Sequence, residues 1–595
     1  MAVSYKAPVK EVIFAFDVLD SYNILQKIER FSDFSPEIAV PAIEECAKFA
    51  EEVLAPINSV GDTHGATFKD GKVIMPPGFH EAYDKFKKAG WASMSLPYEI
   101  GGGGMPYTLS GGTLEILCAA NMSFVLGPGL SIGAISGINF NASVAQKDKY
   151  LPKLVSGDWT GTMNLSEPQS GSDLNHITTK AELQEDGTYK ITGTKIWIGS
   201  GEHDLAENII HLVLAKIPNG PDGVKGISLF IVPKFLVNDD GSLGARNQVS
   251  VGKVEKKMGI HGNATCVMNY DGATGYLVGE EHKGMRAMFT MMNEARLGVG
   301  LQGLSQAELA YQNALAYAKD RLQGRDVTGS KNPNGLADPI IFHPDVRRNL
   351  MDQKCFSEGS RAFILWGANI IDKANQTSDT NADGLIGLLT PVIKGFLTDK
   401  GFDMTIQAQQ IYGGHGYIEE WGMSQFARDA RIAMIYEGAN GIQALDLVGR
   451  KLPQDQGKNM IAFFTILKTY IKENQKKSEE FDNIFLEPMK SATADLEGAV
   501  LYFMEKGIKN PNDALSGSYD FMHLFGYVCL GFMWCKMAEA SFEATTSGSH
   551  NNDFHQSKIS TGQYFMERQL PFTKLHLARI RTGSNVVMKL KPENF

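Results

Sequence analysis

Directly after a predicted β-strand at 160–163, the chain carries the stretch Leu165-Ser166-Glu167-Pro168-Gln169-Ser170-Gly171-Ser172-Asp173. Glycine, proline and small hydroxyl residues favour a turn. A turn of this composition can present backbone N–H groups and hydroxyls to an anionic or carbonyl-rich ligand. An ordinary surface turn has the same composition, so the stretch alone leaves open whether this turn binds anything.

A second stretch, Gly193-Thr194-Lys195-Ile196-Trp197-Ile198-Gly199-Ser200-Gly201, places a tryptophan beside small and hydroxyl-bearing residues. An indole in such a loop can cover one face of a flat cofactor ring. The alternative is a core tryptophan at the end of a strand. The residues alone do not decide between the two.

The third stretch is Ala433-Met434-Ile435-Tyr436-Glu437-Gly438-Ala439-Asn440-Gly441-Ile442-Gln443-Ala444-Leu445. An apolar run here delivers one carboxylate, Glu437, onto a glycine-bounded turn, after which a helix resumes. Burial among apolar residues raises the pKa of a carboxyl group and makes the carboxylate a stronger base. The alternative is an ordinary glutamate at a helix end.

Outward from these stretches, the hydrophobic periodicity changes character twice. A helical pattern begins at Ser35-Pro36-Glu37, gives way to short alternating runs rich in Gly, Thr, Val and Ile, and then returns as long amphipathic helices. Strands between helical segments indicate an α+β protein. We predict an N-terminal extension (1–36), an α-helical domain (37–159), a β domain (160–284), a second helical domain (285–452) and an additional C-terminal helical domain (453–595).

One motif is misleading. Gly298-Val299-Gly300-Leu301-Gln302-Gly303 matches the dinucleotide-binding fingerprint, but that fingerprint works only where a strand turns into a helix. The residues on both sides read as helix here, so we expect these glycines to let two helices approach closely. The sequence also contains no HExxH helix and no Cys/His cluster with zinc spacing, so we predict no metal site.

Composition excludes several classes of protein. The net charge is −10, with Lys and Arg scattered among Asp and Glu, which gives no support for nucleic-acid binding. The six cysteines lie far apart, which suits reduced thiols in the cytoplasm. The uncharged stretch Phe521 to Cys535 falls short of the roughly 20 apolar residues of a spanning helix. We therefore expect a buried helix and no stable membrane insertion, while contact with a membrane surface stays open.

The three stretches occur together and in this order, and on them the chain resembles the acyl-CoA dehydrogenases from about Pro36 through Leu452. Ser166-Glu167-Pro168 with Gly171-Ser172-Asp173, and Tyr436-Glu437-Gly438, look like the two signatures of that family. The resemblance implies an N-terminal α-helical domain, a middle β domain and a C-terminal four-helix domain, with FAD held between them.

The resemblance also implies a role for each residue at a matching position. Glu437 is the implied catalytic base, and Arg296 and Gly438 lie at substrate-side positions. Ser172 is implied to lie near both FAD and the CoA portion of the substrate. The other implied flavin contacts are Met163, Leu165, Ser166, Trp197, Ile198 and Gly199. The residues implied to reach the FAD of a neighbouring subunit are Arg321, Gln410, Gly413 and Gly414.

The chain departs from the family pattern at several of these places. Gly199 replaces a threonine or serine whose hydroxyl usually lies near the flavin, and Gln323 stands where an aromatic is common. Ala439 replaces a common threonine and Gly441 a common glutamine, both near the adenosine end of the cofactor.

The implied chemistry is oxidation of an acyl-CoA between Cα and Cβ. Glu437 would remove the α proton while the β hydride moves to flavin N5, and hydrogen bonds from the Glu437 N–H and a ribityl hydroxyl would stabilise the enolate. Electrons would then pass to an electron-transfer flavoprotein. Three alternatives remain: an acyl-CoA oxidase, a flavin monooxygenase or nitroalkane-oxidising relative, and a catalytically silent acyl-CoA-binding protein.

The two ends of the chain resemble one branch of the family. The tail, with Gln569-Leu570-Pro571-Phe572, and the opening Tyr5-Lys6-Ala7-Pro8 are typical of that branch. It includes the 3-methylmercaptopropionyl-CoA dehydrogenases and broad-specificity fatty acyl-CoA dehydrogenases. The resemblance therefore implies a substrate among these acyl-CoAs and favours a homodimer.

Overall fold

The structure, a computed structural model, describes residues 3–548 and 552–595, with the side chains of 289–294 left aside. The chain divides into two compact units that alternate along the sequence. The β unit consists of Lys48–Pro106 and Ala120–Ala295, and the helical unit of the residues up to Ala47, Tyr107–Ala119 and Arg296–Phe595. Two long helices, α6 (Tyr107–Asn141) and α8 (Gly284–Asp320), contribute residues to both units. The predicted domain boundaries stay predictions.

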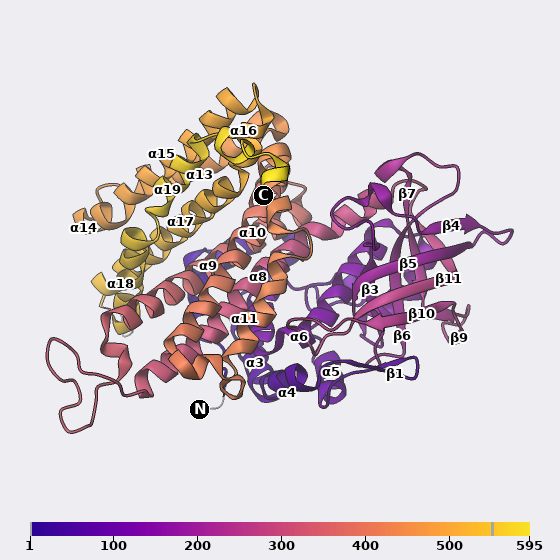
Figure 1. The fold of residues 1–595 in the computed structure, drawn as a ribbon, viewed down its shortest axis with the longest axis horizontal. Coiled ribbons are helices and arrows are strands. Elements are labelled where there is room, and N and C mark those ends of the chain that lie inside the picture. Colours follow the sequence, from indigo (N-terminus) through magenta and orange to yellow (C-terminus); the bar gives the residue numbers. More distant parts are fainter. Residues whose placement is uncertain (1–2, 549–551) are drawn as a thin grey trace. The chain divides into compact units, whose positions relative to one another are not determined.

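A seven-stranded sheet forms the centre of the β unit (Figure 1). Its strands follow the order β10-β11-β5-β4-β6-β3, and β7 pairs with both β11 and β6, so the ladder closes on itself. Closure leaves few unpaired strand edges. The strands are β3 (Trp159–Asn164), β4 (Lys180–Leu183), β5 (Tyr189–Gly199), β6 (Asn208–Lys216), β7 (Ile227–Pro233), β10 (Val249–Val254) and β11 (Thr265–Val278).

The core of the β unit lies between this sheet and two helices. Ile135 of α6 and Leu154 of α7 (Val144–Val155) share one buried apolar cluster with Trp159, Ile210 and Leu229 of the sheet. Burying such side chains stabilises the fold by about 1.5–3 kcal/mol each. The smaller elements of the unit are α4 (Asn58–His64), β1 (Thr67–Lys69), β2 (Lys72–Ile74), α5 (Phe79–Lys88), β8 (Phe235–Val237) and β9 (Leu243–Arg246).

The helical unit is organised around α8, α9 (Pro344–Thr377), α10 (Thr380–Ile411) and α17 (Ser518–Thr546). Figure 1 shows α13, α15, α17, α18 and α19 grouped together. The remaining helices are α1 (Val9–Val18), α2 (Ser21–Gln26), α3 (Pro36–Phe49), α11 (Met423–Arg431), α12 (Asn440–Asp446), α13 (Lys458–Asn474), α14 (Glu479–Phe481), α15 (Glu487–Tyr502), α16 (Pro511–Ser516), α18 (Asn552–Arg568), α19 (Phe572–Arg581) and α20 (Asn585–Met588).

The glycine motif at 298–303 lies inside α8, as predicted. A Cβ atom at Gly300 would stand 2.6 Å from the Ile393 side chain, and one at Gly303 would stand 2.4 Å from the Leu397 carbonyl oxygen. Both contacts belong to α10. The glycines therefore permit close packing of two helices, and the dinucleotide interpretation is excluded for this motif.

Within the described residues, two helices, α6 and α17, are long and apolar enough to span a membrane by length and composition alone. In α17, 94% of the most apolar window is buried inside the protein, against 67% in α6. A helix that is apolar all round and enclosed by other helices is a core helix. The prediction of a buried helix at Phe521–Cys535 is thus confirmed.

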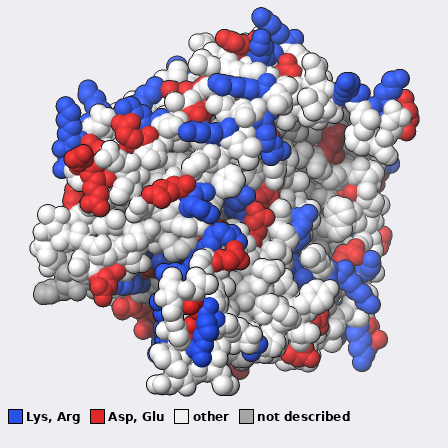
Figure 2. Space-filling view, turned by 60° about the vertical axis from the view of Figure 1, so that its left-hand side comes forward, with Lys and Arg blue, Asp and Glu red and all other residues white. Residues whose placement is uncertain are grey.

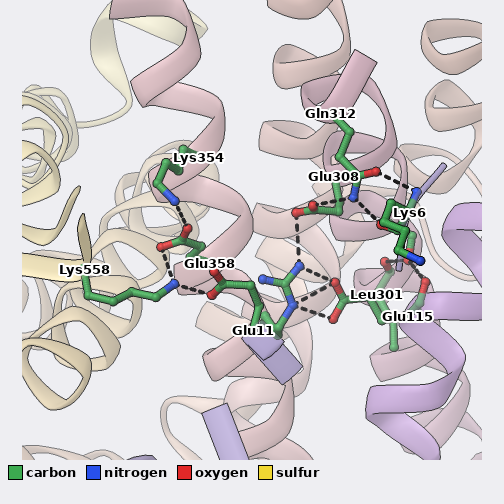
Figure 3. A network of polar contacts seen from close by, with 11 residues as sticks. Lys6, Glu11, Glu115, Leu301, Glu308, Gln312, Lys354, Glu358 and Lys558 are labelled. Carbon is green, nitrogen blue, oxygen red and sulfur yellow. Dashed lines mark hydrogen bonds and ion pairs between the residues drawn. The ribbon is translucent and has the colours of Figure 1, made fainter. Parts of the chain in front are cut away.

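A buried network of charged side chains crosses the helical unit (Figure 3). At its centre, Arg361 of α9 donates to Glu115 of α6 at 2.6 Å and to Glu308 of α8 at 3.1 Å. A second group surrounds Glu358, which pairs with Lys354 and Lys558. Lys558 also pairs with Glu11, so α1, α9 and α18 meet in this second group. The residues drawn with labels are Lys6, Glu11, Glu115, Leu301, Glu308, Gln312, Lys354, Glu358 and Lys558.

All six cysteines are free and buried, as expected for small core residues: Cys46, Cys118, Cys266, Cys355, Cys529 and Cys535. Burial raises the pKa of the Cys118 and Cys266 thiols to about 12. On the face shown in Figure 2, lysine and arginine are interspersed with aspartate and glutamate. Mixed charges of this kind do not create the single-sign field that steers a polyanion to a surface.

Candidate active site

The polar turn after β3 is fixed by a buried ion pair within the β unit. Lys195 of β5 lies 2.9 Å from Glu167, and both side chains are almost fully buried. Glu167 also accepts hydrogen bonds from the backbone N–H groups of Thr178 and Thr179 at 2.6 and 3.0 Å. Burial alone would raise the pKa of Glu167, but Lys195 and these hydrogen bonds outweigh it and hold the pKa at about 2. The carboxylate is therefore ionised at neutral pH and organises the turn around itself.

The strand that carries this lysine connects the two stretches of the β unit that contain predicted flavin contacts. Lys195 donates to the Leu165 carbonyl oxygen at 2.9 Å, and the Ile196 N–H donates to the Ser166 carbonyl oxygen at 2.9 Å. A further bond, from the Thr162 hydroxyl to the Gly199 carbonyl oxygen at 2.7 Å, brings the ends of β3 and β5 together. The predicted contacts on these two adjoining stretches are Met163, Leu165, Ser166, Trp197, Ile198 and Gly199.

Trp197 and Ser172 are the exposed members of the predicted set in the β unit. The Trp197 side chain is 62% exposed, and its backbone lies in the left-handed region with φ of +60°. A large aromatic side chain left open to solvent on a strained backbone is suited to covering a flat ligand. The alternative of a core tryptophan at this position is wrong. Ser172 is exposed on the polar turn.

Gly199 has a packing reason to lack a side chain. A Cβ atom there would stand 2.9 Å from Cδ1 of Leu130 in α6. The space that a threonine or serine side chain would need at this position is therefore occupied by Leu130. The hydroxyl of the next residue, Ser200, does not replace the missing one. Ser200 is buried, and its hydroxyl accepts a hydrogen bond from Asn263 at 3.1 Å.

Glu437 lies in the helical unit on a turn between a short 3-10 segment, Ile432–Met434, and helix α12. Both Glu437 (φ +51°) and Gly438 (φ +87°) adopt left-handed backbone conformations. A non-glycine residue in this region costs roughly 1–2 kcal/mol, so its surroundings must hold it there. A Cβ atom at position 438 would stand 2.4 Å from Nε2 of Gln443, which explains the glycine after the glutamate.

The electrostatic environment of Glu437 combines burial with two nearby positive charges. Its side chain is neither fully buried nor exposed, yet burial raises the pKa of the carboxyl group, opposed by the charges of Arg296 and Lys394. Among the residues the structure describes, none donates a hydrogen bond to this carboxylate. A carboxylate with a raised pKa, partial access and no bonded partner is free to take a proton from a ligand.

Arg296 and Gly438 accompany Glu437 in the helical unit. Nη2 of Arg296 lies 4.0 Å from the position a Cβ atom of Gly438 would take, and Nη1 lies 3.7 Å from Asp446. Nε of Arg296 is buried without a hydrogen-bond partner in the described part of the protein. The structure therefore brings together the three residues predicted for the substrate side of this unit.

One residue that holds the turn was missed by the sequence analysis. Lys394 of α10 is fully buried and donates to the Gly438 carbonyl oxygen and to Oδ1 of Asn440, both at 2.7 Å. Burial lowers the pKa of this lysine to about 7. A single lysine within the apolar run Leu385–Phe396 is the sequence signal that could have identified it.

The remaining predicted residues, Arg321, Gln410, Gly413 and Gly414, are all exposed on the single chain. They lie near one end of α8, where the Tyr317 hydroxyl meets Nδ1 of His415 at 2.8 Å and the Tyr317 and Tyr412 rings stack at 4.1 Å. Their predicted contact with a neighbouring subunit stays a prediction. Within the described ranges, no group of three His, Cys, Asp or Glu side chains could hold a metal ion.

Sequence profiles of known families match nearly the whole chain in four consecutive segments. They are the acyl-CoA dehydrogenase N-terminal domain (42–158), middle domain (162–273) and C-terminal domain (282–452), and the acetyl-CoA dehydrogenase C-terminal-like domain (463–591). The chain belongs to the acyl-CoA dehydrogenase family. It is an FAD-dependent oxidoreductase with the predicted α+β fold, including the additional C-terminal domain.

Two full-length relatives agree with this assignment. This dehydrogenase is 41% identical to the 3-methylmercaptopropionyl-CoA dehydrogenase of Ruegeria pomeroyi, over 98% of this chain and 99% of that protein. It is 31% identical to the broad-specificity linear acyl-CoA dehydrogenase FadE5 of Mycobacterium tuberculosis, over 99% of this chain and 100% of that protein. The branch of the family suggested by the two ends of the chain is thereby confirmed.

Solved structures agree on the fold. The acyl-CoA dehydrogenase of Bacillus anthracis complexed with FAD superposes with a TM-score of 0.75 at 21% identity, covering 94% of this chain and 90% of that one. A structure of the electron transferring flavoprotein of Acidaminococcus fermentans matches with a TM-score of 0.58 at 25% identity, covering 70% of this chain and 98% of that one.

Proposed function

We propose that this dehydrogenase converts a saturated acyl-CoA into a trans-2-enoyl-CoA, with Glu437 as the base that removes the α proton. The observation that carries the proposal is the Glu437 turn. It holds one accessible carboxylate with a raised pKa and no hydrogen-bonded partner among the described residues, on a backbone conformation that would be unfavourable without surrounding support.

The reaction requires more than a base. An α C–H next to a thioester is a weak acid, so the developing enolate oxygen must be stabilised by donors already in place. The backbone N–H of Glu437 has no acceptor among the described residues and can serve as one such donor. Arg296 supplies a positive charge near the same turn, which favours ionised Glu437 before the reaction. FAD, when bound, supplies the acceptor for the β hydride.

The residues of the β unit fit a flavin by their chemistry. Met163 and Leu165 are partly exposed apolar side chains, Trp197 offers an open indole, and the Ser166 hydroxyl lies between them in sequence. An apolar and aromatic surface with a few polar groups is the usual lining of a cofactor site. We assign these residues, with Ser172, Ile198 and Gly199, to flavin binding.

The Lys195–Glu167 pair gives a test of that assignment. We expect Lys195→Met to leave Glu167 buried without its cation, to loosen the turn and to reduce FAD retention, because losing a single buried partner costs about 3–5 kcal/mol. A loss of about 1.4 kcal/mol in binding already weakens affinity tenfold. The measurement is the ratio of flavin to protein absorbance after gel filtration. Lys190→Met, an exposed lysine on the same strand, is the control. Equal FAD in both variants would refute the role given to the pair.

The reaction itself is tested by anaerobic mixing with acyl-CoA. We expect the yellow flavin to bleach within the dead time of manual mixing when a suitable saturated acyl-CoA is added, and the product to be a trans-2-enoyl-CoA. A silent acyl-CoA-binding protein would bind the same compound without bleaching. Peroxide formed in step with turnover under air would instead indicate an oxidase.

The acyl group is proposed from the relatives. One full-length relative is named for 3-methylmercaptopropionyl-CoA and the other for linear acyl-CoAs, so both belong in the panel. The bleaching rate is compared across short, medium, long, branched, aromatic and methylthio acyl-CoAs. The fastest of them shows whether the enzyme prefers a methylthio or a linear acyl group. We propose an acyl-CoA from one of these two classes as the substrate.

We also propose an electron acceptor, an oligomeric state and a cellular compartment for this enzyme. An electron-transfer flavoprotein is proposed as acceptor, supported by the match to the structure from Acidaminococcus fermentans. A homodimer is supported by the exposure of Arg321, Gln410 and Gly413 on the single chain, together with a fully exposed Leu336 in the segment after α8. The six free, buried thiols suit a reducing compartment, and we propose the cytoplasm.

A further inference from the structure

The carbonyl group that follows the proposed base is held from two directions. The Gly438 carbonyl oxygen accepts from Lys394 at 2.7 Å and from the Gln443 side chain at 3.1 Å. Because Glu437 and Gly438 have consecutive positive φ angles, fixing this carbonyl restrains the rotations that would let the turn relax. Lys394 is therefore a positioning residue for the turn.

Lys394 is itself held through Asn440. Oδ1 of Asn440 accepts from Lys394 at 2.7 Å, and Nδ2 donates to Oδ1 of Asp399 at 2.6 Å. Lys394, Asn440 and Asp399 are all buried, at 0%, 5% and 4% exposure respectively. Burial alone would raise the pKa of Asp399, but its hydrogen bonds, from His523 and Tyr519 above all, keep the pKa below the usual value.

The other oxygen of Asp399 faces the additional C-terminal domain. Oδ2 accepts from Nε2 of His523 at 2.9 Å and from the Tyr519 hydroxyl. Both residues lie one turn apart on α17, within the segment 463–591 that a separate family profile matches. The rings of Tyr519 and His523 lie 4.7 Å apart, and His523 also packs edge-on against Phe396 at 5.5 Å.

We propose that α17 of the additional C-terminal domain positions the catalytic turn: Tyr519 and His523 fix Asp399, which through Asn440 and Lys394 fixes the Gly438 carbonyl beside the base. The proposal rests on the role given to Glu437 above. It assigns a purpose in catalysis to a domain that contains none of the residues predicted to touch substrate or cofactor. Burying a carboxylate and a lysine is costly, and a fully bonded chain between them is the arrangement that offsets this cost.

The test compares hydrogen-bond donors on α17. Tyr519→Phe and His523→Leu each remove one donor to Asp399, whereas His523→Gln keeps an N–H near the position of Nε2. Tyr470→Phe is the control, because it removes a tyrosine hydroxyl that donates to the Glu539 carboxylate at 2.8 Å in the same domain. Each variant is purified with FAD, its flavin content is measured, and the rate of anaerobic flavin reduction is recorded with ordinary and α-deuterated acyl-CoA.

For the double variant Tyr519→Phe/His523→Leu we expect flavin reduction to slow by about ten- to a hundredfold, the range expected when a catalytic group is misplaced by about 1 Å. The KM for acyl-CoA and the FAD content should stay near the wild-type values, and the isotope effect from the α position should increase, because proton abstraction becomes slower. His523→Gln should recover most of the rate lost in His523→Leu. A purely structural role would not move the isotope effect.

Two results would overturn the inference: a double variant that reduces its flavin as fast as Tyr470→Phe does, or a His523→Gln variant as slow as His523→Leu. Glu437→Gln separates this failure from failure of the proposed function. If Glu437→Gln is inactive and the α17 variants are as active as the wild type, Glu437 is the base but α17 does not position it. If Glu437→Gln remains active, Glu437 is not the base, and the proposed function is contradicted before the role of α17 is tested.

Discussion

Glu437→Gln is expected to purify yellow, with FAD bound, and to lose about three or more orders of magnitude in turnover, since general-base catalysis alone contributes at least about 10²–10⁴-fold. Glutamine has nearly the same volume and keeps the backbone N–H proposed to stabilise the enolate oxygen, but it cannot accept the α proton. The measurement is the rate of anaerobic flavin reduction by a saturating acyl-CoA. A glutamine variant that still turns over would remove Glu437 from the mechanism.

The pH dependence of the wild-type enzyme checks the same residue. Burial raises the pKa of Glu437, so the fraction of ionised base falls at a higher pH than for an ordinary glutamate. The rate of flavin reduction should therefore decline as the pH drops through this raised pKa, and the decline should be absent from the residual activity of Glu437→Gln.

Arg361→Met is expected to produce the largest loss of stability. Arg361 is 1% exposed, and its removal leaves the buried carboxylates of Glu115 and Glu308 without their shared cation. Breaking a buried pair by removing one partner costs about 3–5 kcal/mol, because an uncompensated charge remains in the interior. The measurement is the shift in the urea unfolding midpoint, followed by tryptophan fluorescence.

The matched control is Lys490→Met, which breaks an ion pair with Glu487 in which both side chains are more than half exposed. Exposed pairs of this kind contribute little, so the midpoint should hardly move. If Arg361→Met and Lys490→Met unfold at the same urea concentration, the buried network has no stabilising role.

Local patterns in the sequence were sufficient for the order of helical and strand-rich segments. The return of helices after residue 284, the buried helix at Phe521–Cys535 and the glycine-bounded turn at Glu437 all follow from periodicity and turn residues. Closure of the sheet by β7 was not predictable, since strand pairing joins residues far apart in the chain. The alternation of the chain between two compact units was likewise out of reach, because it depends on which distant faces pack together.

In the candidate site, too, local sequence patterns predict some residues, whereas long-range packing determines others. Glu437 could be predicted from its apolar run and its glycine, which are local signals. Lys394 could not be paired with the Gly438 carbonyl, because the two residues are 44 positions apart and only the packing of α10 brings them together. The contact between His523 and Asp399 spans 124 positions. Hydrogen bonds across such separations leave no periodic trace in a sequence.

The burial of every cysteine affects how readily the thiols of this enzyme are oxidised. Peroxide attacks cysteine in its thiolate form. Here burial raises the pKa of all six thiols, so almost no thiolate is present at neutral pH. Buried thiols with raised pKa values are therefore poor targets for oxidation by peroxide.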